Sequence, residues 1–116
     1  MLKITNNFSL AELTFTKQPL PNAPCTFVII NLCWGVHQIL QPLRNYIGVP
    51  ITITSGYRSA EVNKAVGGVP TSQHLDGCAA DCVVPSEVFN KALDYITRYL
   101  PFDQLLVGKS FFHVSW

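Results

Sequence analysis

The chain has 116 residues, of which 48% are apolar and only 13% are charged, and its formal net charge at pH 7 is +1. This length is sufficient for one compact domain with its own core, so we expect a single domain over residues 1–116. The high apolar content excludes a disordered segment. The small, scattered charge provides no electrostatic footprint for nucleic acid or for an anionic membrane.

The sequence shows no targeting or membrane-spanning segment. Residues 1–7 become polar at once and lack the apolar core of a secretory signal peptide. Apolar stretches such as Phe27–Ile30 are far too short to span a bilayer. We therefore expect a protein made in the cytoplasm that reaches an extracellular target only when lysis or another machine releases it. The spacing of the four cysteines argues against local disulfides and favours free, mostly buried thiols, with long-range pairs as the alternative.

The first expected element is a short helix near the N-terminus. Residues Phe8–Leu13 carry the pattern of a capping box, in which Ser9 accepts a backbone hydrogen bond and Glu12 stands three positions later. Residues 16–24 contain three prolines and an asparagine, and they predict a loop.

A long helix and a strand should follow this loop. From about residue 25 to residue 47, apolar side chains recur at helical spacing, and Pro42 should kink or break the helix near its end. Residues 51–54 alternate β-branched side chains and predict a strand. Ser59 is then well placed to cap a short helix.

The second half of the chain predicts three more strands and a helix. Residues 78–84 should form a strand with Asp81 on one face and both of its cysteines on the other, which disfavours either thiol as a metal ligand beside that carboxylate. A helix over residues 85–100 and a hairpin of residues 104–107 with residues 111–116 complete the pattern. We therefore predict an α+β class in which a small, mainly antiparallel sheet packs against helices.

The last expected strand directs one histidine away from the core. His113 shares a strand face with Phe111 and Ser115, whereas the intervening side chains are apolar. A period of two therefore points His113 toward an adjoining site. The alternative is a histidine that fills a gap at the edge of the sheet.

Two further residues make a metal site plausible. Asp81 lies in a strand whose other residues are predicted to be buried. An ionised carboxylate there needs a metal or an ion pair, for example with Arg58. His74 precedes Gly77 and two alanines, which let a loop and a strand pack closely around an ion. Two imidazoles and one carboxylate are a common zinc set that leaves one coordination position open. We therefore predict zinc binding by His74, Asp81 and His113.

Several segments spread over nearly the whole chain together resemble one family. This family is the zinc D-alanyl-D-alanine carboxypeptidases with the hedgehog/DD-peptidase-like fold, in particular its small phage and bacterial peptidoglycan peptidases. The segments that carry the resemblance are Phe8–Leu13, Ser55–Ser59, Val62–Gly68, Ser72–Asp81, Phe102–Leu105 and His113–Ser115.

The resemblance implies zinc on the same three side chains and roles for two others. Arg58 should stabilise the oxyanion of a tetrahedral intermediate or hold a substrate carboxylate, with an ion pair to Glu61 as the alternative. Ser72 should hydrogen-bond the substrate carboxylate, with stabilisation of its own turn as the alternative.

The sequence departs from the family pattern shortly before the last histidine. Many relatives carry a glutamate or aspartate there as the general base and acid, but residues 105–112 contain no carboxylate. Gly108 aligns with that glutamate, and Phe111 occupies the position at which some relatives carry a second histidine. Asp103 is the nearest acid, but the resemblance places it in the Phe102–Leu105 segment and not at the catalytic position, so the proton shuttle is either unassigned or Asp103. Loss of a general base typically costs about 10²–10⁴-fold in rate.

The function that the resemblance implies is a zinc metallopeptidase that hydrolyses a peptide bond in peptidoglycan stem peptides. Such a protein would be carboxypeptidase-like or endolysin-like and monomeric, with no nucleic-acid partner and no membrane span. The alternative is a catalytically impaired, zinc-containing protein that binds wall peptide or has a structural role, because the expected carboxylate before His113 is missing. A third hypothesis is a domain of a larger virion or cell-surface assembly.

Overall fold

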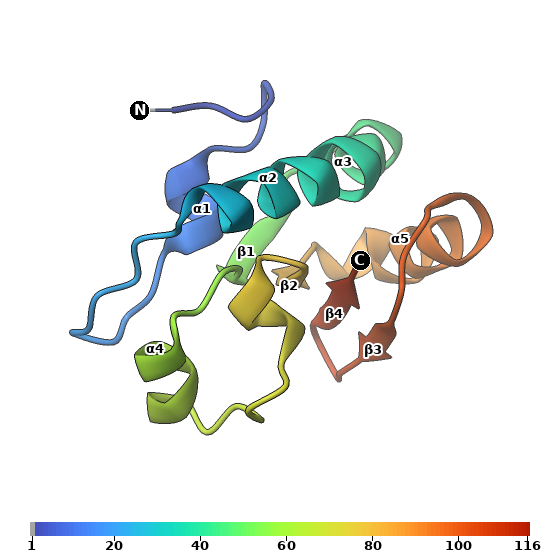
Figure 1. Ribbon diagram of the computed structural model, residues 1–116. Coiled ribbons are helices and arrows are strands. Elements are labelled where there is room, and N and C mark those ends of the chain that lie inside the picture. The colour runs from blue at the N-terminus through green and yellow to red at the C-terminus, as the bar shows by residue number, and fades with distance from the viewer. Residues whose placement is uncertain (1) are drawn as a thin grey trace.

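The computed structural model describes residues 2–116 and confirms the predicted α+β class (Figure 1). One four-stranded antiparallel sheet is covered on one face by helices. The helices are α1 (Leu10–Thr14), α2 (Thr26–Gly35), the π-helical turn η1 (Val36–Leu40), α3 (Gln41–Ile47), α4 (Ala60–Ala65), the 3₁₀ helix η2 (Gln73–Asp76) and α5 (Ser86–Tyr99). The strands are β1 (Thr52–Ser55), β2 (Ala79–Val83), β3 (Leu105–Val107) and β4 (Phe112–Ser115).

The register of the sheet aligns one residue from each strand in a row across its open face. The strand order is β1-β2-β4-β3, and Asp81 of β2 lies opposite Ser55 on one side and opposite His113 on the other. Leu106 of β3 lies opposite His113. A bulge between Ile53 and Ser55 shifts the register of β1 so that Ser55 reaches this row.

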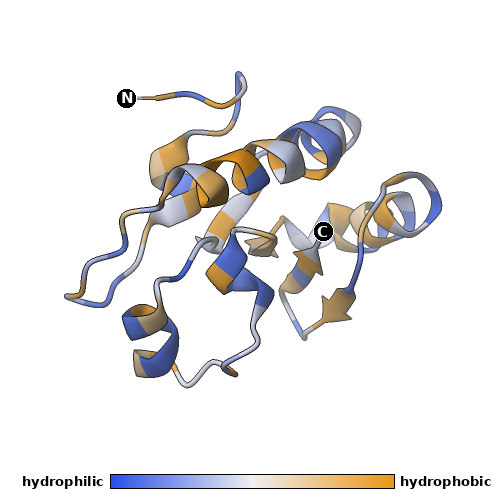
Figure 2. Ribbon diagram, in the orientation of Figure 1, coloured by the Kyte–Doolittle hydropathy of each residue, from blue (hydrophilic) through white to orange (hydrophobic). Residues whose placement is uncertain are grey.

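The other face of the sheet is the core. Alternate strand residues such as Ile53, Cys82 and Phe112 are buried against α2, α3 and α5. Figure 2 shows that β3 is hydrophobic throughout and that α2 is largely hydrophobic, whereas α5 alternates hydrophobic and hydrophilic positions as expected for a helix with one buried side. Among residues 2–116, none of the helices combines the length and apolar character needed to cross a bilayer.

Pro42 does not break the long helix. Residues 26–47 are helical throughout, as the consecutive elements α2, η1 and α3 (Figure 1). Proline lacks a backbone N–H and its ring crowds the carbonyl of the preceding turn. The wide π-helical turn directly before Pro42 makes room for its ring and its missing N–H. In this turn the N–H of Gln41 bonds to the carbonyl of Val36 five residues earlier.

The local signals at helix ends are confirmed. Ser9 accepts from the backbone N–H of Glu12, and the Glu12 carboxylate accepts from the backbone N–H of Ser9, which is a complete capping box. Ser59 caps α4 by accepting from the backbone N–H of Val62. Both helices flank segments that lead to the site described below.

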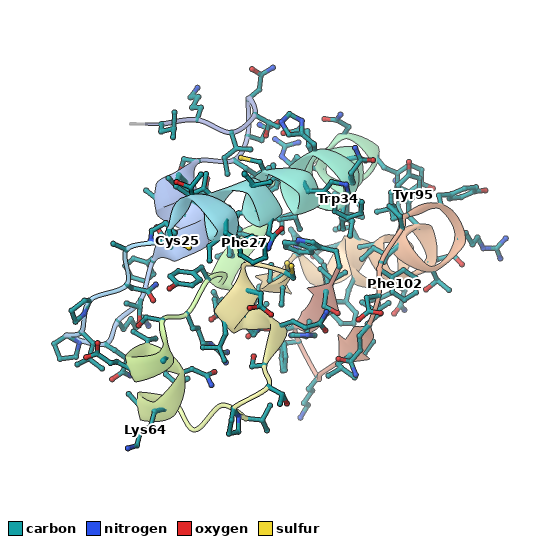
Figure 3. All side chains as sticks on the ribbon, viewed as in Figure 1. Cys25, Phe27, Trp34, Lys64, Tyr95 and Phe102 are labelled. Carbon is teal, nitrogen blue, oxygen red and sulfur yellow. The ribbon has the colours of Figure 1, made fainter. Side chains whose placement is uncertain are left out.

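The cysteines are free, as predicted, but the expectation that most are buried is wrong. Cys82 is buried, Cys33 and Cys78 are half-buried, and Cys25 is exposed. Cys25 is the residue that precedes α2 and lies at its exposed end (Figure 3).

Gly77 lies in the turn that connects η2 to β2, and substitution of this glycine measures how tightly the chain is packed next to the site. Gly77 and Gly48 both have left-handed backbone, with φ of 73° and 72°. A Cβ at position 77 would lie 2.8 Å from the carbonyl oxygen of Val28, whereas a Cβ at position 48 would meet nothing within 4 Å. Both alanine variants should lose about 1–2 kcal/mol through the left-handed conformation.

We expect Gly77→Ala to lower the free energy of unfolding by about 1–3 kcal/mol more than Gly48→Ala, because it adds a clash with backbone. Urea denaturation of both variants provides the comparison. Equal losses would contradict the packing described here.

Candidate metal centre

Three side chains that are distant in the sequence converge on one point. His74 of η2, Asp81 of β2 and His113 of β4 offer ligand atoms that all lie within 4.8 Å of one another. The Oδ1 atom of Asp81 is 3.3 Å from Nε2 of His74 and 2.9 Å from Nδ1 of His113. Tetrahedral zinc with bonds of about 2.0–2.1 Å holds its ligand atoms about 3.3 Å apart. The donor set therefore fits one zinc ion.

The backbone explains why these side chains meet. Asp81 and His113 are directly paired across β2 and β4, so their side chains project from the same face at adjacent positions. His74 enters from η2, and the left-handed turn at Gly77 then leads the chain into β2. The strand alternation used to predict the direction of His113 thus corresponds to the arrangement in the structure.

A backbone carbonyl determines which nitrogen of His74 faces the site. Nδ1 of His74 lies 2.6 Å from the carbonyl oxygen of Gly56, and His74 is only 3% exposed. Because a carbonyl oxygen can only accept, Nδ1 carries the hydrogen, and Nε2 is directed at Asp81. Metal-binding histidines usually have such a partner on the second nitrogen. Sequence analysis did not find Gly56, since a backbone acceptor has no signature in side-chain identity.

Asp81 divides its two oxygens between the histidines and Arg58. Its Oδ2 accepts from Nη2 of Arg58 at 3.3 Å. Arg58 is itself held by the Ser55 hydroxyl at 3.0 Å and by the Asn63 side-chain carbonyl at 3.2 Å. Thus the ion pair considered as an alternative for Asp81 is present together with the histidine cluster. Among the described residues, Arg58 forms no ion pair with Glu61.

The electrostatics keep Asp81 ionised. Burial by itself would raise the pKa of Asp81, but hydrogen bonds from His113 and His74 and the charges of both rings outweigh it and hold the pKa well below its usual range. A carboxylate oxygen and two ring nitrogens at these distances repel one another unless a proton or a cation lies between them. The cluster is therefore suited to a positive ion at its centre.

Comparison with known proteins shows the family of this chain. The chain matches the family model described as Peptidase M15 over residues 6–115. It belongs to the Peptidase M15 family. A segment of this M15 chain is also 43% identical over 51 residues to the zinc D-Ala-D-Ala carboxypeptidase of Streptomyces albus G. That segment is 43% of this chain and 20% of the relative's length. The family resemblance inferred from the sequence is confirmed.

The cluster of this M15 protein opens into a groove of about 420 Å³. Of the described residues that line the groove, Asp81 is the single carboxylate. Gly108, at the position where the family resemblance predicts a glutamate, is part of the groove wall, and a Cβ there would overlap the ring of Phe111. A glycine and a phenyl ring therefore form this part of the wall.

The structure does not bring the predicted shuttle Asp103 into this groove. Asp103 does not line it, and its carboxylate accepts from the side-chain amide of Gln73 at 3.1 Å. The backbone N–H of Asp103 donates to the carbonyl of Ser115, and this hydrogen bond anchors the start of the final hairpin. The sequence placed Asp103 close to the site only along the chain.

Ser72 does line the groove, and it also stabilises the turn before His74. Its hydroxyl accepts from the backbone N–H of His74 at 3.2 Å, as the alternative interpretation predicted. The cysteines stay apart from the cluster. Burial raises the pKa of the Cys82 thiol, with a smaller contribution from Asp81, and burial likewise raises the pKa of Cys78, so both thiols are protonated at neutral pH.

Removal of the carboxylate charge should disable the metal site. We expect Asp81→Asn to lower zinc affinity by more than about 100-fold, since loss of an outer partner alone costs 10–100-fold. Isothermal titration calorimetry with zinc measures this effect. Asp103→Asn is the matched control because it removes an exposed carboxylate outside the groove, and it should leave affinity unchanged. Equal losses in the two variants would count against Asp81 as a ligand.

The hydrogen on His74 can be observed directly. In zinc-loaded protein labelled with nitrogen-15, we expect the imidazole shifts of His74 to show a protonated Nδ1 and a ligated Nε2, because Gly56 requires a donor. A protonated Nε2 would show that the ring does not coordinate in the way the carbonyl contact implies.

Proposed function

We propose that this member of the M15 family is a monomeric zinc-dependent peptidase that hydrolyses a peptide bond in peptidoglycan stem peptides. The observation that carries the proposal is the convergence of His74, Asp81 and His113 at the floor of an open groove. Family membership supports peptide hydrolysis, and the similarity to a zinc D-Ala-D-Ala carboxypeptidase supports both the metal and a peptide that ends in D-alanine.

The residues around the cluster are suited to this chemistry. When bound, zinc supplies Lewis-acid polarisation of a carbonyl and activation of water for attack. His74 is held by the Gly56 carbonyl and Asp81 by Arg58, so neither ligand has to be oriented when substrate arrives.

Arg58 is the residue best placed to bind negative charge on the substrate. A guanidinium has five N–H donors, and three of them are engaged by Ser55, Asn63 and Asp81. The other two belong to the terminal nitrogens of a side chain that lines the groove. We propose that they bind the substrate carboxylate or the developing oxyanion.

Ser72 has a complementary role in the proposal. Its oxygen accepts from the backbone N–H of His74, which leaves the hydroxyl hydrogen free to donate. A donor at this position of the groove suits a substrate carboxylate. The same hydroxyl would thus stabilise the ligand-bearing turn and bind the substrate.

We expect this chain to differ in proton transfer from relatives that have a general-base carboxylate. Asp81 is the single carboxylate among the described groove residues and is committed to the cluster, while the Asp103 carboxylate is bonded to Gln73. We therefore expect hydrolysis about 10²–10⁴-fold slower than with a general base in place. This same observation favours the second candidate, a zinc-containing protein that binds wall peptide without cleaving it. A role in phage or prophage lysis stays a prediction.

Incubation of zinc-loaded protein with an acetylated Lys–D-Ala–D-Ala peptide and with purified peptidoglycan separates the two candidates. We expect slow release of D-alanine or of new termini, which His113→Ala abolishes because it removes a ligand. Asp103→Asn should change the rate by less than about twofold; a loss of about 10²-fold would instead identify Asp103 as the proton shuttle. Binding of wall peptide without any new termini would favour the binding protein.

A further inference from the structure

Asn63 is a buried polar residue of α4 that lies next to the groove without lining it. It is 4% exposed, whereas the neighbouring Lys64 points outward to solvent (Figure 3). The described residues that line the groove include Arg58 and residues 67–69, which we call the rim segment, but not Asn63. A buried side-chain amide costs free energy unless it is hydrogen-bonded. The partners of Asn63 therefore indicate what this residue contributes.

The side-chain amide of Asn63 joins Arg58 to the rim segment. Its Oδ1 accepts from Nη1 of Arg58 at 3.2 Å, and its Nδ2 donates to the carbonyl of Val69 at 2.9 Å. A guanidinium can only donate and a carbonyl can only accept, so a single orientation of the amide satisfies both partners. A carboxylate of the same shape would place a second acceptor against the Val69 carbonyl. The position is therefore suited to asparagine.

Backbone contacts also tie the rim segment to Asn63. The N–H of Gly68 donates to the backbone carbonyl of Asn63 at 2.8 Å. A Cβ at position 68 would overlap Oδ1 of Asn63 and would lie 3.1 Å from Nη1 of Arg58. The backbone of Gly68 thus lies directly against the hydrogen bond between these two side chains. The rim segment therefore packs against Arg58 through Asn63.

Asn63 completes the set of acceptors that orients Arg58. Each nitrogen of the guanidinium has one acceptor, because Nε donates to the Ser55 hydroxyl, Nη1 to Asn63 and Nη2 to Asp81. Three contacts in different directions fix the plane of the group and leave one further N–H on each terminal nitrogen. A carboxylate that is bound by both terminal nitrogens needs these two N–H groups in a fixed plane.

The neutral charge of this acceptor is equally important. Asp81 already places one negative charge beside Arg58, at 3.3 Å from its Nη2 atom. Asn63 holds the other terminal nitrogen with an uncharged carbonyl, so no second negative charge opposes that of the guanidinium. The attraction between Arg58 and an anionic ligand depends on this positive charge.

We propose that Asn63 is a positioning residue, which orients Arg58 for the carboxylate of the substrate and couples that orientation to the rim segment. The inference rests on the proposed function for the role of Arg58. Asn63 does not itself touch the ligand, because it acts through Nη1 of Arg58 and through the carbonyl of Val69. The side chain that binds the anion and the segment that borders the groove thus share one buried amide.

Two peptides test this role: acetylated Lys–D-Ala–D-Ala with a free C-terminal carboxylate, and the same peptide with an amidated C-terminus. Their affinities for metal-free and zinc-loaded protein can be obtained by following backbone amide shifts in NMR titrations. We expect the unaltered protein to prefer the free acid. Asn63→Ala should lower this preference, which is the ratio of the two affinities, by about tenfold, as expected for one hydrogen bond to a charged group. Affinity for the amidated peptide should change by less than about twofold.

A measurement without ligand tests the orientation of Arg58 directly. In protein labelled with nitrogen-15, relaxation of the Arg58 Nε–H, which donates to the Ser55 hydroxyl, should report a rigid group. We expect Asn63→Ala to increase the picosecond-to-nanosecond motion of this N–H, because two remaining contacts no longer fix the plane of the guanidinium. A substitution that only lowers stability leaves this signal unchanged in the folded protein.

Three further variants separate positioning from folding. Asn63→Asp keeps the shape of the side chain but replaces a donor with an acceptor and adds a negative charge beside Arg58, so it should also reduce the preference for the free acid. Gly68 is not among the described glycines with left-handed backbone, so Gly68→Ala acts through the displaced Asn63 amide and should have the same effect. Asn31→Ala is the matched control, because Asn31 also donates to a backbone carbonyl, that of Asp76, but does not line the groove. It should leave the preference unchanged.

The outcomes distinguish this inference from the proposed function. Equal losses for the two peptides in Asn63→Ala, an Arg58 Nε–H that stays as rigid as in the unaltered protein, or no preference for the free acid in the unaltered protein would overturn the positioning role. If amide spectra show that Asn63→Ala does not fold, Asn63→Asp and Gly68→Ala decide by the same criteria.

Zinc titration and peptide cleavage on the same samples test the proposed function independently. A protein that binds zinc and cleaves the free acid at an unchanged rate in Asn63→Ala would keep the peptidase and lose the positioning role. A preference for the free acid that depends on Asn63, in a protein that does not bind zinc, would do the reverse.

Discussion

The arrangement around Asp81 is the constraint on which the site depends. One carboxylate oxygen faces both histidines and the other accepts from Arg58. A carboxylate that is largely withdrawn from water is costly unless it is paired and hydrogen-bonded. Here one oxygen accepts from Arg58, and the other faces two ring nitrogens, so that a proton or a cation is required between them. The sheet register, the bulge in β1 and the turn at Gly77 all serve to bring these partners to one carboxylate. Sheet pairing and the Gly77 turn thus position the residues that surround the ionised Asp81.

The elements nearest to the site were predictable because they depend on local chemistry. Ser9 and Ser59 cap helices as their sequence context indicates, and the alternation around Asp81 and His113 directs both side chains to the open face. These signals involve neighbours within a few positions, or a period of two. The zinc hypothesis could thus be formed from the sequence, because it gives the residue types and strand alternation predicts the face to which the Asp81 and His113 side chains point.

Other features depend on contacts that the sequence does not encode locally. Arg58 pairs with Asp81 and not with Glu61 because the pairing of β1 with β2 brings Asp81 opposite Ser55, to which Arg58 also bonds. The acceptor for His74 is a backbone carbonyl. Nearness along the chain suggested Asp103 as a shuttle, but the fold turns its carboxylate to Gln73. The helix remains continuous at Pro42 because the backbone widens into a π-helical turn just before this proline. No pattern of residue types in the sequence predicts this turn.

Two imidazoles and one carboxylate should together hold a single zinc ion. Zinc K-edge X-ray absorption on the loaded protein can measure this, because it reports the kind of ligand atom and its distance without dependence on catalysis. We expect nitrogen and oxygen ligands at about 2.0–2.1 Å with two imidazole contributions. A shell that contains sulfur at about 2.3 Å, or a spectrum with no ordered imidazole ligands, would contradict it.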